Sequence, residues 1–290
     1  MPGIMCVRVW DVEHGCCVML QHVASSGLGQ NVGGRLAMID SGSSADFQPS
    51  TYLREDLGRD KVDYLFITNA DQDHMSDLQG LEDAGIKVGT MFRNRSYTAD
   101  QIRDMKLVSG PLTRDATWYV NACRTFNSPV TEPFNENMGG ITCRCFWNKY
   151  PDFTDTNNLS LAVFIKFGDF KMLLPGDLER PGWLALLERD EFCAELAGTN
   201  VLMASHHGRK SGFCDELFDY FTPDCVVISD KPIVHTTQEM VRDYRAVTSE
   251  RGVYVRTTGK KRHVLTTRRD GWIMFTVEDQ DYNIDTEYEG

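Results

Sequence analysis

The sequence predicts an α+β fold in which two packed, mixed β-sheets are flanked by helices. Short β-rich runs outnumber helical segments at the start of each half of the chain, and each half then alternates strand and helix. The 290 residues, 41% of them hydrophobic and 25% charged, are enough to bury a large core. Because no short repeat and no linker interrupts the pattern, we expect one domain over residues 1–277, followed by an acidic tail at 278–290.

In the first half, a hairpin opens the chain, with Gly15 at its turn. Residues 25–34 are rich in Gly, Ser and Asn, which is typical of a loop. A helix is expected at 49–57, with Pro49 at its start, and another follows the fourth strand and ends near Gly85. The strands predicted for this half cover 6–12, 16–22, 35–39 and 62–67.

The second half begins with a helical pattern of mixed polarity at 100–127 and a loop at 128–140. Helices are expected at 181–196 and 237–248. The tail at 278–290 carries six acids. The predicted strands cover 141–147, 161–167, 170–174, 201–204, 225–229, 252–256, 263–267 and 271–277.

One stretch stands out chemically, the sequence Thr-Asn-Ala-Asp-Gln-Asp-His at 68–74. It joins the buried strand at 62–67 to a helix, and it packs the side chains of Asp71, Asp73 and His74 into four residues. Neighbouring carboxylates in a cleft repel one another and lose hydration, and a bound divalent cation removes both costs. A solvated turn with an Asp N-cap is the alternative, and this stretch alone does not decide between them.

Other polar side chains also follow predicted strands directly. If those strands share one direction, their ends meet at a single edge of the sheets, where such folds place their sites. Imidazole combined with carboxylate suits Zn²⁺, Mn²⁺ or Fe, while more oxygen ligands favour Mn²⁺ or Mg²⁺. The positions concerned are Asp40, residues 69–74, Asp177, His206, His207 and His235.

Seven short motifs, spread over about residues 6–270, resemble those of the metallo-β-lactamase superfamily, in the family's order. Within it, the chain is similar to the hydrolase domain of ComEC-type competence (DNA-uptake) proteins and their stand-alone relatives. The resemblance implies a four-layer αββα sandwich of the metallo-β-lactamase type. The motifs are Asp-Val-Glu-His-Gly at 11–15, Met-Ile-Asp-Ser-Gly at 38–42, the stretch at 68–74, Asn-Leu-Ser-Leu at 158–161, Leu-Leu-Pro-Gly-Asp at 173–177, Ser-His-His-Gly at 205–208, and the late strand ending in a histidine at 228–235.

The resemblance also implies the metal ligands. Asp73 and His74 would bind the second metal, Asp177 would bridge, and His235 would be the late ligand. Asn69 and Asp71 stand at the first-metal positions, where the family has a leading histidine in place of Asn69. No histidine stands near residues 157–158 to complete that site, and an amide oxygen is a weaker ligand than imidazole. We therefore expect divalent ions, Zn²⁺ or Mn²⁺, with one strong site and a second that is weak or completed by substrate.

Further roles follow from the same motifs. His206 and His207 are expected to act in catalysis together with Asp73; as neighbours in an extended segment they would point in opposite directions, so one of them would face the metals. Asp40 is expected to orient a ligand. Arg209, Lys210 and Lys231 are candidate phosphate contacts, whereas His14, His22 and His263 are interpreted as structural.

The predicted function is that of a metal-dependent hydrolase, most simply a phosphodiesterase or nuclease that uses a metal-bound hydroxide. The alternatives are a carboxylic ester or thioester hydrolase, and a catalytically degenerate member of the fold that acts as a binding or sensor protein. Nucleic acid or another phosphodiester is the expected partner, and a protein partner stays open. The net charge of −12 argues against nonspecific coating of nucleic acid, although a late basic hairpin could follow phosphates. With no long apolar run, no signal-peptide core and nine unpatterned cysteines, we expect no membrane contact and a cytoplasmic location.

Overall fold

The computed structural model describes residues 3–25, 31–278 and 281–289. Within them, fifteen strands form two mixed sheets. The larger sheet has nine strands in the order β12-β11-β15-β14-β1-β2-β3-β4-β5, and the smaller has six in the order β13-β10-β9-β8-β7-β6. The predicted fold class is confirmed.

The larger sheet joins the two ends of the chain, because the first strand pairs with a late one: Val7 lies opposite Phe275 in an antiparallel ladder. Its β3, β4 and β5 run parallel to one another. The strands are β12 (Lys260–Arg262), β11 (Val253–Val255), β15 (Asp281–Thr286), β14 (Ile273–Glu278), β1 (Ile4–Val9), β2 (Val18–Ser25), β3 (Asn31–Ile39), β4 (Lys61–Phe66) and β5 (Lys87–Phe92).

In the smaller sheet, β7 pairs antiparallel with both β6 and β8, and the remaining strands are parallel to β8. β8, β9, β10 and β13 run in the same direction, so their carboxyl ends share one edge. The strands are β13 (Val264–Thr266), β10 (Cys225–Ile228), β9 (Val201–Met203), β8 (Phe170–Leu174), β7 (Leu161–Phe167) and β6 (Thr142–Trp147).

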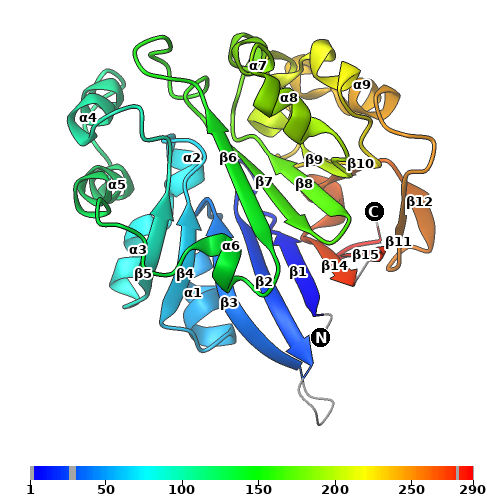
Figure 1. Cartoon of the computed structure of the whole chain (residues 1–290), viewed down its shortest axis with the longest axis horizontal. Helices are drawn as coiled ribbons and strands as arrows, with labels where there is room; N and C mark the ends of the chain where they lie inside the picture. Colours follow the sequence, from blue (N-terminus) through cyan, green and yellow to red (C-terminus); the bar gives the residue numbers. More distant parts are fainter. Residues whose placement is uncertain (1–2, 26–30, 279–280, 290) are drawn as a thin grey trace.

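Helices cover the outer faces of both sheets, which gives four layers. In Figure 1, α4 and α5 lie beside the sheet that contains β4 and β5, whereas α7 and α8 lie beside the one that contains β8. The helices are α1 (Pro49–Thr51), α2 (Gln72–Met75), α3 (Leu78–Asp83), α4 (Ala99–Leu107), α5 (Arg114–Thr125), α6 (Phe134–Asn137), α7 (Arg180–Leu187), α8 (Asp190–Leu196), α9 (Val241–Ala246) and α10 (Thr267–Asp270).

Three apolar clusters fill the spaces between the layers. Alternate residues of the strands, such as Phe66 and Val163, pack between the two sheets. Leu78 and Tyr119 pack under the helices of the larger sheet, and Trp183 packs under those of the smaller sheet. Both sheets are thereby held rigidly, and the loops at their shared edge are anchored on fixed strands.

Several predicted boundaries change in the structure. Residues 31–34 belong to β3 rather than to a loop, and the rest of that predicted loop, 26–30, lies outside the described residues. The single helix predicted at 181–196 is two helices, α7 and α8. Strand β5 and the short helix α6 were not predicted.

The prediction of an acidic tail at 278–290 is wrong for the described part of that segment. Strand β15 pairs along its whole length with β14, and Ile284 lies opposite Phe275 with none of its surface exposed. Within β15, Asp281, Asn283 and Asp285 alternate with Tyr282, Ile284 and Thr286, and this period of two places Ile284 and Thr286 in the buried face. The fold therefore extends beyond residue 277.

Among the described residues, every helix is too short or too polar to cross a bilayer. All nine cysteines lie in the described part of the chain, and each is a free thiol.

We predict that Ile284→Ala lowers the free energy of unfolding by about 2–5 kcal/mol, because it leaves a cavity between the sheets. Ile233→Ala makes the same chemical change at a side chain that is 45% exposed, and should cost about 0.5 kcal/mol or less. Urea unfolding of both variants measures the difference. Equal, small losses would mean that β15 contributes nothing to the core.

Candidate metal centre

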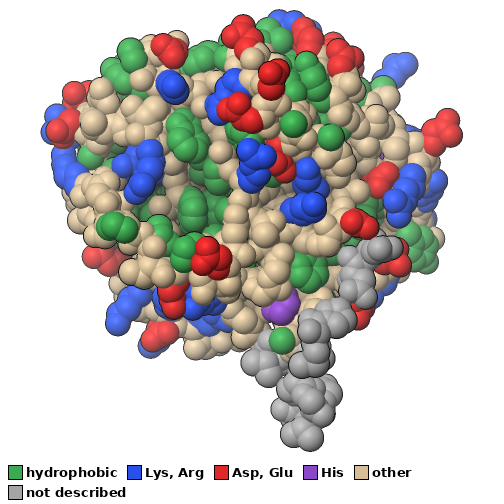
Figure 2. Space-filling model, in the orientation of Figure 1, with side chains coloured by type: hydrophobic (Ala, Val, Ile, Leu, Met, Phe, Trp, Pro, Cys, Tyr) green, Lys and Arg blue, Asp and Glu red, His purple; other side chains and the backbone are tan. Residues whose placement is uncertain are grey.

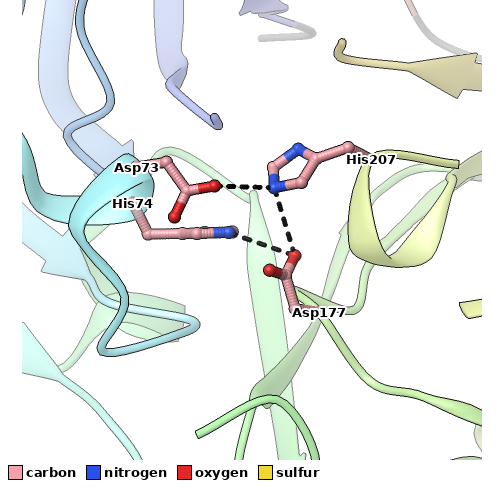
Figure 3. Close-up of side chains that lie close together, drawn as sticks. All are labelled: Asp73, His74, Asp177 and His207. Carbon is pink, nitrogen blue, oxygen red and sulfur yellow. Dashed lines mark ion pairs between the residues drawn. The ribbon is translucent and has the colours of Figure 1, made fainter. Parts of the chain in front are cut away.

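Four side chains from three separated segments converge at the edge between the sheets. Asp73 and His74 lie in α2, which a short loop connects to β4. Asp177 lies in the turn after β8. His207 lies in a short 3₁₀ segment, Ser205–Gly208, after β9. Figure 3 shows the four side chains pointing toward one another from their three elements.

The distances within this cluster fit a single small ion. Asp73, His74, Asp177 and His207 each offer one ligand atom, and these atoms all lie within 4.8 Å of one another. The Nε2 atom of His207 is 3.2 Å from Asp73 Oδ2 and 3.5 Å from Asp177 Oδ1. The Nε2 atom of His74 is 3.1 Å from the same Asp177 oxygen.

Three of these atoms are buried and lack a hydrogen-bond partner among the described residues: His74 Nε2, Asp177 Oδ1 and His207 Nε2. A buried polar atom without a partner is costly, and three that face one common point are explained by a cation there. Two imidazoles and two carboxylates form a ligand set suited to Zn²⁺, Mn²⁺ or Fe²⁺. The residues present therefore fit one divalent metal.

Each histidine of the cluster is fixed through its other ring nitrogen. His74 Nδ1 is 2.7 Å from Asp40 Oδ2, and Asp40 Oδ1 accepts the backbone N–H of Thr68 at 2.7 Å. His207 Nδ1 is 3.1 Å from the carbonyl oxygen of Ser229. Contacts of this kind select the tautomer that turns Nε2 toward a metal. Asp40 thus has the contact that its predicted orienting role requires.

The backbone around these residues is unusual. Asp40, His206 and His207 have positive φ angles of 60°, 50° and 54°. Because of the turn at 206–207, this segment is not extended, as the sequence suggested. His207 enters the cluster, while His206 lines the cavity above it and Ser211 Oγ lies 3.0 Å from its Nδ1.

Without metal, the cluster balances its own charge. Burial opposes the charge on His207, but the carboxylates of Asp177 and Asp73 outweigh it and raise the pKa of His207 to about 9. Burial likewise opposes ionisation of Asp177, yet His74 and His207 hold the pKa of Asp177 well below its usual range. The pKa of His74 is raised in the same way by Asp177 and Asp40, against the effect of burial. Metal binding must therefore displace protons from the histidines.

The predicted first-metal residues have other partners. Asp71 Oδ1 is 2.6 Å from the Lys106 ammonium, and its Oδ2 accepts the hydroxyl of Thr156 at 2.9 Å. Asn69 donates to Asn157 at 3.2 Å. A lysine cation thus already pairs with the carboxylate that a first metal would need, so these residues do not fit a metal.

The remaining predicted residues divide between the site and the surface. Arg209 lines the cavity next to the cluster. His235 is exposed and outside the cluster, so the structure does not bring it to the other ligands. Lys210 and Lys231 are also exposed and do not line the cavity.

The cluster opens into a cavity of about 570 Å³, large enough for a small substrate. Both positive and negative groups line it, so it offers an anion contact and metal ligands together. Its lining residues are His14, Ser43, Asp71, Gln72, Asp73, Ser76, Asn157, Asp177, His206 and Arg209.

Two residues at the site were missed by the sequence interpretation. His14, interpreted as structural, has its Nε2 atom 3.2 Å from Asp73 Oδ2. Lys106 lies in α4, about thirty residues beyond the motif with which it pairs. The signal that could have identified His14 was the motif at 11–15, which is the first of the seven motifs that resemble the family and lies in the first hairpin. Nothing in the sequence pattern distinguished Lys106.

Residues 24–135 match the family model of the Metallo-beta-lactamase superfamily. Among solved structures, a protein from Parabacteroides distasonis ATCC 8503, provisionally described as a metal-dependent hydrolase, is 12% identical with a TM-score of 0.45, over 90% of this chain and 93% of that one. A mutant of the CmlA β-hydroxylase is 15% identical with a TM-score of 0.50, over 93% of this chain and 54% of that one. CmlA itself, a diiron β-hydroxylase from Streptomyces venezuelae, has a TM-score of 0.48 at 15% identity, over 94% and 54% of the two chains.

These likenesses concern the fold, and this chain spans about half the length of the two hydroxylase chains. No curated protein matches it in sequence. The four layers and the metal-ligand cluster at the shared sheet edge define a protein of the metallo-β-lactamase fold. Residues 24–135, which include Asp40, Asp73 and His74, carry the sequence pattern of the metallo-β-lactamase superfamily.

We predict that the metal-free protein loses stability between pH 6.5 and about 9. The pKa of His207 rises from its ordinary 6.5 to about 9 on folding, so its contribution is complete below pH 6.5 and disappears as the pH rises through 9. Chemical unfolding in chelator across this range measures the slope. His207→Gln should flatten it, and His22→Gln, on β2, should not. An unchanged slope in His207→Gln would contradict the assignment.

Proposed function

We propose that this protein is a hydrolase that depends on one divalent metal ion and acts on a small phosphodiester. One observation carries the proposal: three buried, unpartnered ligand atoms converge on one point beneath an open cavity. A divalent metal held by Asp73, His74, Asp177 and His207 would supply an acidified water and polarise the bond to be cleaved.

The chain's own residues would divide the remaining work. Arg209 is positioned at the cavity to bind an anionic oxygen of the substrate. His206 lines the cavity outside the cluster, and burial lowers its pKa. Because this imidazole is not taken up as a ligand, it is the candidate to carry a proton to or from the leaving group.

A small substrate is favoured over a long polynucleotide. Figure 2 shows basic and acidic side chains scattered among one another over the face in view, with no extended positive track. In the late basic hairpin, Arg256 pairs with Asp285 and Arg262 pairs with Asp270, so both charges are already balanced. To bind a polynucleotide, a protein needs lysine and arginine side chains that are free to neutralise the phosphates of the nucleic acid. Cleavage of a polynucleotide would use the same chemistry, but we expect it less than cleavage of a small phosphodiester.

A single metal is favoured because Lys106 pairs with Asp71, one of the two predicted first-metal ligands. Its ammonium lies 2.6 Å from Asp71 Oδ1, and a divalent ion could occupy that position only by displacing it. This also disfavours dinuclear chemistry.

The first test is hydrolysis of bis(p-nitrophenyl) phosphate with added Mn²⁺, Zn²⁺ or Fe²⁺. We expect metal-stimulated activity that falls at least about 100-fold in Asp177→Asn, since loss of a ligand should exceed the 10–100-fold typical of supporting residues. Asp169→Asn, the same change at an exposed turn, should leave the activity unchanged. Cleavage of p-nitrophenyl acetate alone would favour an ester hydrolase, and bound metal without any activity would favour a binding or sensor protein.

The second test counts metal in the purified protein by mass spectrometry. We expect one equivalent per chain in the wild type and in Asp71→Asn, because Asp71 is held by Lys106 and Thr156. Asp177→Asn should bind markedly less. Two equivalents in the wild type, with one lost in Asp71→Asn, would contradict the single-metal proposal.

A further inference from the structure

Three histidines at the candidate centre are built in the same way. In each, an oxygen acceptor holds Nδ1 while Nε2 faces a carboxylate of the cluster. For His74 and His207, the acceptors are Asp40 and the Ser229 carbonyl. For His14, the acceptor is Asp230, at 3.1 Å from Nδ1. We propose that His14 is a further ligand of the same metal, an inference that rests on the metal centre proposed above.

His14 lies outside the group of four whose ligand atoms are all within 4.8 Å of one another, and it meets that group at Asp73 and His207. Its Nε2 atom is 3.2 Å from Asp73 Oδ2, and the Nε2 atom of His207 is 3.2 Å from that same oxygen. The rings of His14 and His207 have centroids 4.5 Å apart. His14 is partly exposed, with 27% of its side chain accessible, so it lies where the centre meets the cavity.

The hydrogen bonds around His14 indicate which ring nitrogen carries the proton and which carries the lone pair. Asp230 is a buried carboxylate beside Nδ1, so Nδ1 donates to it. Arg209 lies 3.3 Å from Nε2 and can only donate, so Nε2 presents a lone pair. That lone pair also faces Asp73 Oδ2, which is a second acceptor. Two acceptors facing each other repel unless a cation stabilises them, and a metal ion between Nε2 and Asp73 would replace the contact that Arg209 makes here.

The loop that carries His14 is docked directly onto the ligand segment. The N–H of Cys16 donates to the carbonyl of Asp73 at 3.3 Å, and Ser229 Oγ donates to the carbonyl of Gly15 at 2.8 Å. Gly15 has a φ of 139°, and a Cβ atom there would stand 2.3 Å from the Asp73 carbonyl oxygen. Only glycine permits this close approach, so His14 is held at a fixed place beside Asp73.

The chemical consequence is a ligand set of three imidazoles and two carboxylates. Position 69, which has an asparagine in this chain, contributes no imidazole, and His14 supplies one beside Asp73. An added nitrogen donor shifts the preference of the site away from Mg²⁺ and toward Zn²⁺, Fe²⁺ or Co²⁺.

The test compares metal affinity and the Co²⁺ absorption spectrum in wild type and His14→Gln, using chelator-stripped protein and a competing chromophoric chelator. We expect at least about tenfold weaker Co²⁺ binding in the variant, together with a changed visible spectrum, because the number of nitrogen donors falls. In His14→Gly, added imidazole should restore the wild-type spectrum. His22→Gln, a matched change in the same hairpin on β2, should bind and absorb like wild type.

The outcomes separate this inference from the proposal beneath it. Tight Co²⁺ binding by wild type with the same affinity and spectrum in His14→Gln would overturn the ligand role and leave the four-residue centre intact. A folded wild-type protein that binds no Co²⁺, Zn²⁺ or Mn²⁺ would overturn both. Restoration of the spectrum by imidazole in His14→Gly supports direct ligation, because a purely structural role for His14 would not respond to free imidazole.

Discussion

The centre of this molecule depends on one electrostatic constraint: the carboxylates of Asp73 and Asp177 both lie next to the Nε2 atom of His207, and Asp177 is almost completely buried. Asp177 is 3% exposed, and an isolated carboxylate there would be strongly disfavoured. His74 and His207 lower the pKa of Asp177 in the absence of metal. This compensation is incomplete, because Asp177 Oδ1 and both Nε2 atoms are in ion-pair contact with one another but make no hydrogen bond. The arrangement of the site suits a cation, and the raised pKa values of His74 and His207 mean that a metal would compete with protons for both nitrogens.

The surrounding backbone is strained in ways that serve this arrangement. Asp40, His206 and His207 hold positive φ angles, each of which costs of the order of 1–3 kcal/mol for residues other than glycine. The strain is sustained by the neighbouring strands: Asp40, whose carboxylate binds His74, directly follows β3, and β9 leads into the turn at 206–207. Because two packed sheets fix the starting point of each loop, the ligands meet without help from the metal.

Much of this was visible in the sequence, and the failures have physical causes. Alternating strand patterns predicted the layers, and polar residues after buried strands predicted the convergence of Asp73, His74 and Asp177. The role of Lys106 could not be predicted. Its ion pair with Asp71 joins residues 35 apart in sequence and depends on how α4 packs, which no local pattern specifies. The strand β15 was missed because its exposed face is acidic, and composition there concealed the period of two.

His14 and Lys106 contact different carboxylates of the ligand segment, Asp73 and Asp71, and together they influence where a metal can lie. The ammonium of Lys106 balances Asp71 and removes the charge that a first metal would need. His14 brings a lone pair to Asp73, on a loop that Gly15 docks against the same segment. Metal affinity depends on the number and charge of the available donors. A metal ion would therefore bind more tightly near His14 and His207 than near Asn69 and Asp71. With asparagine at position 69, the proposed centre would thus take its third imidazole from the loop between β1 and β2.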